Sequence, residues 1–169
     1  MNFAVRSATQ QDIGALATVE LLAAQRFEGD VLVEGLQKKT VPFKDLQAAQ
    51  SDGLLWVAET LTDGIVGFLV ATGLDGGLHI SEMGVIPSHG RQGIGSALLR
   101  AAKTHARDSR IPRVTLTTFA SVPWNAPFYA KHGFTELAST EIGPGLRQCI
   151  NLERTLGLAN RVAMSTSDA

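Results

Sequence analysis

The sequence predicts an α/β fold with a mixed sheet, and three observations support this prediction. Residues 54–85 contain three apolar runs separated by short turns rich in glycine and aspartate, which is typical of antiparallel strands. A glycine-rich loop and a helical segment follow the third run directly. Residues 113–119, RVTLTTF, are rich in β-branched residues, and a strand that follows a strand and a helix is expected to lie parallel to the earlier strand.

The other elements follow from apolar periodicity and from turn residues. Thr9 and Asp12 resemble a capping box at the start of a long helix that reaches residue 27, and a break is expected at residues 28–30. Further helices are predicted over residues 43–50, 96–105, 125–132 and 146–156. Strands are predicted over residues 3–6, 54–59, 65–71, 78–85, 113–119, 134–137 and 161–164.

Length and composition are those of one globular domain. The chain has 169 residues, of which 44% are hydrophobic and 18% charged, so we expect a single domain over residues 1–164 and a short disordered tail over residues 165–169. The net charge of −1 gives no electrostatic basis for binding nucleic acid or an anionic membrane. Cys149 is the single cysteine, and we expect a cytoplasmic protein without a signal peptide or a membrane span.

Residues 85–99, VIPSHGRQGIGSALL, form the stretch with the clearest chemistry. An apolar strand ends at Val85, a loop with three glycines follows, and a helix begins. The first turn of a helix leaves backbone N–H groups unpaired at the positive end of the dipole, and glycine lets that backbone approach a phosphate. The loop therefore predicts an anion site, and a turn that needs glycine only for its geometry is the alternative. Its spacing fits neither a Rossmann fingerprint nor a Walker loop.

This loop resembles motif A of the GNAT superfamily of N-acetyltransferases, Q/R-x-x-G-x-G/A after a strand that ends in V-x-P. Gly93 and Gly95 fall on the two glycine positions, whereas the Gln or Arg position falls on Gly90 and an arginine comes one residue later. The resemblance implies that the loop holds the pyrophosphate of acetyl-coenzyme A (acetyl-CoA). The loop residues that it assigns to this cofactor are Arg91, Gln92, Gly93, Ile94, Gly95 and Ser96.

Residues 122–134, VPWNAPFYAKHGF, form a second informative stretch. Taken alone, Asn125 is a helix cap, and Phe128 and Tyr129 are core aromatics. The stretch resembles motif B of the same superfamily, in which an asparagine and a tyrosine on one helix precede a Gly-Phe pair. The two motifs together imply the GNAT fold over about residues 54–137, a mixed and mostly antiparallel sheet with a splayed parallel pair, flanked by helices.

The resemblance also implies roles for individual residues. Acetyl transfer to an amine requires a bound thioester, a polarised carbonyl, a deprotonated amine and a protonated leaving thiolate. Backbone groups of Met83 and Val85 are expected to bind the pantetheine arm, and Asn125 and Phe128 are assigned to the cofactor as well. Tyr129 matches the position that protonates the coenzyme A thiolate in many members, unless its ring only packs.

Glu82 is the candidate base, as a single acidic residue within an apolar strand. An alkylamine, with a pKa of ~10.4, is mostly protonated at pH 7, so a carboxylate that attracts the ammonium and takes its proton serves this step. A solvent-exposed or sheet-paired Glu82 is the alternative, and His79 is a weaker candidate base. Cys149 is interpreted as a buried helix residue, and the four widely spaced histidines lack metal-ligand spacing, so no metal is expected.

The acceptor is the least determined part of the prediction. Arg26, Phe27 and Trp124 are candidate contacts for it, and surface or packing roles are the alternative. We expect an enzyme that moves an acetyl group from acetyl-CoA directly to the primary amine of a small molecule. The alternatives are a protein amine as acceptor, a longer acyl group, or a non-catalytic domain that binds or senses acyl-CoA. Members of the superfamily often dimerise, so a homodimer is possible.

Overall fold

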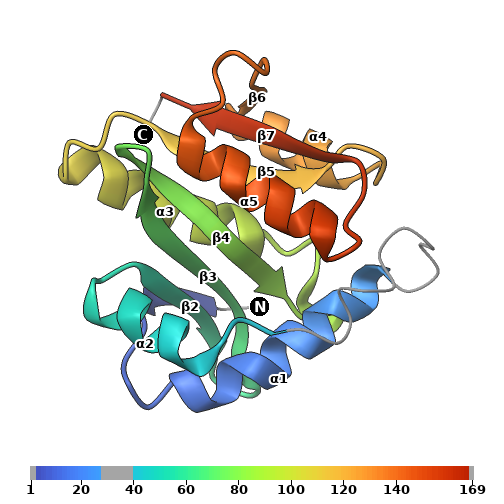
Figure 1. Ribbon diagram of the computed structural model, residues 1–169. Helices are drawn as coiled ribbons and strands as arrows, with labels where there is room; N and C mark the ends of the chain where they lie inside the picture. Colours follow the sequence, from blue (N-terminus) through green and yellow to red (C-terminus); the bar gives the residue numbers. More distant parts are fainter. Residues whose placement is uncertain (1–2, 28–39, 168–169) are drawn as a thin grey trace. The chain divides into compact units, whose positions relative to one another are not determined.

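The computed structural model describes residues 3–27 and 40–167, and its strands form one mixed sheet with helices beside it (Figure 1). The helices and strands are β1 (Phe3–Ser7), α1 (Ile13–Ala24), η1 (Gln25–Phe27), α2 (Phe43–Ser51), β2 (Leu55–Thr60), β3 (Gly64–Leu74), β4 (Gly77–Val85), η4 (Pro87–His89), α3 (Ile94–Asp108), β5 (Val114–Phe119), α4 (Asn125–Ala130), β6 (Thr135–Glu136), α5 (Pro144–Thr155) and β7 (Arg161–Thr166).

The sheet has seven strands in the order β1-β2-β3-β4-β5-β7-β6. Strands β1, β2 and β3 pair antiparallel, and so do β5, β7 and β6. Strand β4 lies parallel to β5, with Leu78 opposite Val114 and Ile80 opposite Leu116. The predicted α/β class with a mixed, mostly antiparallel sheet and one parallel pair is therefore confirmed.

The chain divides into two compact units, and β3, β4 and α3 contribute residues to both. The first unit comprises residues 1–72 and 81–102, and the second comprises residues 73–80 and 103–169. In the first unit, α1 and α2 lie against the same face of β2 and β3 (Figure 1). Its core contains Ile13, Leu16 and Val19 from α1, Leu46 and Ala49 from α2, and Leu55, Val57, Phe68 and Val70 from the strands.

Helix α1 packs tightly on β4 at a glycine. A Cβ placed on Gly84 would lie only 3.0 Å from the Cβ of Ala23, a distance that real Cβ atoms rarely show. Glycine at this position therefore allows the helix to lie directly against the strand. This contact fixes which residues of α1 face β4.

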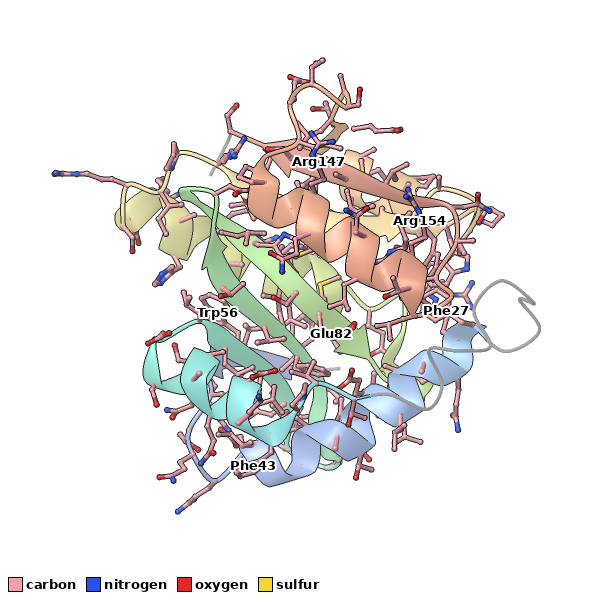
Figure 2. The ribbon with its side chains drawn as sticks, viewed as in Figure 1. Phe27, Phe43, Trp56, Glu82, Arg147 and Arg154 are labelled. Atoms are coloured by element: carbon pink, nitrogen blue, oxygen red, sulfur yellow. The ribbon has the colours of Figure 1, made fainter. Side chains whose placement is uncertain are left out.

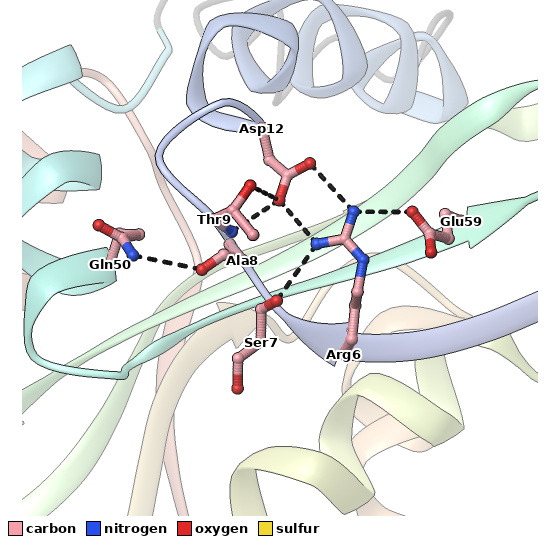
Figure 3. Close-up of polar contacts among 7 residues, drawn as sticks. All are labelled: Arg6, Ser7, Ala8, Thr9, Asp12, Gln50 and Glu59. Carbon is pink, nitrogen blue, oxygen red and sulfur yellow. Dashed lines mark hydrogen bonds and ion pairs between the residues drawn. The ribbon is translucent and has the colours of Figure 1, made fainter.

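A guanidinium group ties the start of α1 to β1 and β2 (Figure 3). Arg6 donates from Nη1 to Asp12 at 2.7 Å and from Nη2 to Glu59 at 2.7 Å. Asp12 also accepts the backbone N–H of Thr9 at 2.6 Å, which closes the turn that precedes the helix. Asp12 itself is the N-cap of α1 and makes no side-chain cap hydrogen bond, so the predicted capping box of Thr9 and Asp12 is not formed. The hydrogen bonds from Arg6 hold the pKa of Asp12 well below its usual range, so this contribution to stability is present at neutral pH and is lost only in strong acid.

In the second unit, Asp75 connects the turn between β3 and β4 to the start of α5. Its carboxylate accepts the backbone N–H groups of Gly145 and Leu146, both at 2.9 Å. These first-turn amides have no partner inside the helix, and the carboxylate also faces the positive end of the helix dipole. A Cβ on Gly145 would lie 2.9 Å from an oxygen of Asp75, so glycine leaves the room that this contact needs.

The remaining differences from the predicted elements lie at their ends. Helix α1 ends at Ala24, and the turn η1 continues to Phe27, while the break expected at residues 28–30 lies outside the described residues. Strand β7 continues through Ser165 and Thr166, which pair with β5, so these two residues are not part of a disordered tail. Helix α3 starts two residues before the expected Ser96, and its buried residues are Ile94, Leu98, Leu99, Ala102 and Ala106.

Candidate functional site

The loop between β4 and α3 contains a run of backbone N–H groups without an acceptor in the described part of the chain. The amides before this run are used inside the loop, because that of Gly90 donates to the carbonyl of Pro87. After the run, the amide of Ala97 donates to the carbonyl of Gly93. The five amides of residues 91–95 have no protein acceptor among the described residues. Consecutive free donors at the N-terminus of a helix form an anion site.

Two residues of this loop have a left-handed backbone. Gly93 has a φ of 85°, and a Cβ placed on it would meet no atom within 4 Å, so the space beside the backbone is open. Arg91 has a φ of 58°, a conformation that costs a residue with a Cβ about 1 kcal/mol. Gly90, which occupies the Gln or Arg position of the motif, has an ordinary φ of −65°. The loop therefore contains backbone strain at Arg91 beside the free amides.

Positive charge gathers near the same loop within the first unit. Arg26 lies in η1, and burial and the nearby charge of Arg91 together lower its pKa. Phe27, also in η1, is partly exposed at the end of this segment (Figure 2). Of the candidate acceptor contacts, Arg26 thus lies near the loop of residues 91–95, where its charge suits an anion.

Glu82 lies on β4 and is partly exposed (Figure 2). Its Oε1 accepts the backbone N–H of Met83 at 3.0 Å. The N–H of Met83 is thus occupied by the side chain of the preceding residue.

A second carboxylate, which no motif indicates, lies near Glu82 in the first unit. Glu20 on α1 is only 9% exposed, and its two oxygens accept the backbone N–H of Val41 at 2.9 and 3.2 Å. Burial and, next, the charge of Glu82 raise the pKa of Glu20 to about 7. The sequence contains a signal for this residue, because Glu20 continues the buried face that Ile13 and Leu16 begin.

Helix α4 in the second unit positions the residues of the second stretch. Asn125 is 8% exposed, and its Oδ1 accepts the hydroxyl of Thr118 on β5 at 2.6 Å. The ring of Tyr129 meets those of Phe128 and Phe134 edge to face, with centroids 5.2 and 6.0 Å apart. Trp124 precedes the helix and is partly exposed. The oxygen of Asn125 is thus held by the fold, which orients its amide group.

Two other titratable residues are poorly suited to the reaction. His79 is 4% exposed, its Nδ1 lies 3.0 Å from the hydroxyl of Thr115, and burial lowers its pKa to about 4. Such an imidazole is neutral at pH 7 and a very weak base, which favours Glu82 over His79. Burial raises the pKa of the Cys149 thiol, so this cysteine stays protonated and is a poor nucleophile.

Two further features are absent from residues 3–27 and 40–167. Within them, no three His, Cys, Asp or Glu side chains gather closely enough to hold a metal ion. No helix in that part of the chain has the length and apolar character needed to cross a membrane.

A match to a family model shows to which protein family the chain belongs. The model described as an acetyltransferase (GNAT) domain matches residues 51–136. The chain belongs to the GNAT acetyltransferases. The matched region contains Glu82, the 91–95 loop, Asn125 and Tyr129, so both stretches that resemble the superfamily motifs lie within it.

Solved structures of other GNAT proteins share the fold. A GNAT-family acetyltransferase from Staphylococcus aureus has a TM-score of 0.76 at 15% identity, over 99% of this chain and 100% of that chain. The PaiA N-acetyltransferase from Thermoplasma acidophilum, solved with coenzyme A, has a TM-score of 0.75 at 15% identity, over 99% of both chains. The Escherichia coli N-acetyltransferase for an alanine of a ribosomal protein has a TM-score of 0.67 at 15% identity, over 99% of this chain and 95% of that chain.

Replacement of Arg91 by glycine tests the strained residue of this GNAT loop. The variant is expected to raise the free energy of unfolding by about 1 kcal/mol, because glycine adopts the left-handed backbone without strain. It is also expected to weaken binding of acetyl-CoA about five- to tenfold, because one charged donor beside the amides is lost. Urea unfolding and titration calorimetry measure the two effects. Arg110→Gly, at another left-handed arginine (φ 57°), is the control and should gain stability alone.

Proposed function

We propose that this GNAT protein transfers the acetyl group of acetyl-CoA directly to the primary amine of a small molecule. The observation that carries the proposal is the run of five loop amides at the start of α3 without a protein acceptor among the described residues. These donors suit the diphosphate of coenzyme A, and the open space beside Gly93 leaves room for it. The PaiA relative, which has the same fold, was solved with coenzyme A.

Two side chains, Glu82 and Tyr129, carry out the proton transfers in this proposal. Acetyl-CoA supplies the activated acetyl group when it is bound. Glu82 takes one proton of the acceptor ammonium, directly or through a water molecule, and the free amine attacks the carbonyl carbon of the thioester. As the carbon–sulfur bond breaks, Tyr129 gives its phenol proton to the leaving sulfur, and the second proton lost by the amine nitrogen restores the phenol. A phenol has a pKa of ~10 and a thiol one of ~8.5, so Tyr129 stays protonated at neutral pH and is able to donate. The backbone of Val85 and the amide of Asn125 bind the pantetheine arm.

A protein amine is the second candidate acceptor. The likeness to the Escherichia coli enzyme, whose name gives an alanine of a ribosomal protein as its acceptor, favours this possibility. Arg26 and Phe27 are the residues of the first unit that we propose to contact either acceptor. Trp124 is the third residue that we propose for this role.

A thiol-release assay with acetyl-CoA tests the proposal. The panel contains small primary amines and short peptides with free N-termini, and titration calorimetry of acetyl-CoA binding accompanies it. Release that depends on a small amine is the expected result, and release that depends on the peptides alone would select the protein acceptor. Tight binding of acetyl-CoA without thiol release in the presence of either the small amines or the peptides would favour a domain that only senses acyl-CoA. Absence of binding would refute the proposal altogether.

Replacement of Glu82 by glutamine tests the base. The side chain keeps its size and still accepts the N–H of Met83, but it no longer takes a proton. We expect kcat/KM to fall by about 100-fold at pH 6.5, where free amine is scarce, and by less at pH 9. The measurement is kcat/KM against pH with the best acceptor of the panel. Glu136→Gln, an exposed glutamate on β6, is the matched control, and a profile parallel to the wild type at every pH would argue against Glu82 as the base.

A further inference from the structure

Glu20 and Glu82 project into the same interface between α1 and β4. The contact of Ala23 with Gly84 fixes the helix on the strand. Glu20 comes three residues before Ala23 and therefore lies on the same face of the helix, while Glu82 comes two residues before Gly84 and lies on the same face of the strand. The register thus places both residues on the facing sides of α1 and β4, and the charge of Glu82 acts on Glu20.

The surroundings of Glu20 provide no compensating positive charge within the described residues. Its carboxylate accepts one backbone N–H, that of Val41, and the one charge that acts on it is that of Glu82 on β4. Helix α2 keeps its charged residues Lys44 and Asp45 exposed. In η1, the charge of Arg26 is coupled to that of Arg91.

A pair of carboxylates in such an interface titrates as a unit, and the more buried member binds the proton first. Glu20 is 9% exposed, whereas Glu82 is partly exposed. We propose that Glu20 is a positioning residue that holds the proton of this pair, so that Glu82 keeps the negative charge that attracts the acceptor ammonium. The catalytic part of this inference rests on the proposed function, whereas the coupling between the two carboxylates does not.

The protonation state of Glu20 then changes close to neutral pH. Its pKa of about 7 means that it is mostly protonated at pH 6 and mostly ionised at pH 8.5. In the ionised state a second negative charge lies beside Glu82 and strengthens the attraction for a cationic acceptor. The folded-state pKa is above the ordinary value of 4.5, so the contribution of Glu20 to stability is lost as the pH rises from that value to about 7.

Replacement of Glu20 by glutamine tests the catalytic part. The amide oxygen still accepts the N–H of Val41, but the side chain no longer ionises. The KM for a cationic acceptor is expected to be within about twofold of the wild type at pH 6, and about five- to tenfold higher than the wild type at pH 8.5, because only the wild type gains the second charge. A KM ratio that is the same at both pH values would mean a merely structural role and would overturn the proposal. Glu136→Gln serves again as the exposed control.

A titration by ¹³C NMR of the glutamate carboxyl groups tests the coupling without any activity. We expect the signal of Glu20 to change near pH 7 in the wild type, and at a clearly lower pH in Glu82→Gln, where the neighbouring charge is absent. The Glu20→Gln variant should also gain stability over the wild type, in urea unfolding, as the pH is raised from 5 to 8.5. An ordinary Glu20 midpoint in both proteins would overturn the inference even if amine acetylation is observed. A protein that shows the coupling and lacks thiol release would refute the proposed function and the catalytic role of the pair, and leave the shared proton established.

Discussion

Replacement of Gly93 by valine is expected to weaken binding of acetyl-CoA by about 100-fold or more, which corresponds to about 2.7 kcal/mol. Two effects act together at this residue. A β-branched residue does not adopt the φ of 85° without strain, so the loop amides lose their arrangement. The side chain would also fill the open space beside the backbone, where the phosphates are proposed to lie. Titration calorimetry at constant salt measures the loss.

The control for this variant carries the same backbone strain elsewhere. Gly157, which follows α5 in the second unit, has a φ of 84°, and a Cβ placed on it would also meet no atom within 4 Å. Gly157→Val and Gly93→Val should therefore lose similar amounts of stability, of the order of 1–3 kcal/mol, whereas Gly157→Val should keep the affinity of the wild type for acetyl-CoA. Equal affinities of Gly93→Val and the wild type would show that the loop is only a turn.

Replacement of Tyr129 by phenylalanine is expected to lower kcat by about 100-fold, because the variant has no phenol proton for the leaving sulfur. The affinity for acetyl-CoA should change by less than about twofold, because the ring still packs edge to face on Phe128 and Phe134. Steady-state kinetics at pH 7 give kcat, and titration calorimetry gives the affinity. A lower kcat with an unchanged affinity would indicate that Tyr129 donates a proton and does not merely pack.

Phe134→Leu provides the opposite perturbation. It removes a ring that packs on Tyr129 and keeps the hydroxyl group of the tyrosine. If the hydroxyl donates the proton, this variant should clearly lower the free energy of unfolding, since Phe134 is buried, and should lower kcat only slightly. A smaller fall of kcat in Tyr129→Phe than in Phe134→Leu would leave Tyr129 as a packing residue.

The sequence was sufficient for the elements of the fold because local signals and packing agree in this chain. The turn residues Asp63-Gly64 and Asp75-Gly76 separate the strands of the predicted antiparallel part, and the structure confirms all three strands. The parallel position of β5 followed from its place after β4 and α3. The loop was recognisable because glycines, an arginine and a helix start occur at one point of the sequence.

Contacts between distant residues account for what could not be predicted. The burial of Glu20 depends on Val41 and on its position opposite Glu82, and no local pattern encodes either neighbour. The left-handed backbone of Arg91 could not be predicted either. The neighbouring Gly90 is the residue that would be expected to adopt that conformation, because glycine does so without strain. The use of the Met83 amide by Glu82 depends on a side-chain rotamer that sequence does not specify.

The capping of α5 by Asp75 has a consequence for how this part of the chain can vary. The carboxylate and the amides that it caps are separated by about 70 residues, yet each depends on the other. A substitution at Asp75 leaves the start of α5 uncapped, and a larger residue at Gly145 displaces the carboxylate. The turn after β3 and the first turn of α5 are therefore expected to be inherited together. Transplanting α5 into another GNAT scaffold would require the donor's turn as well.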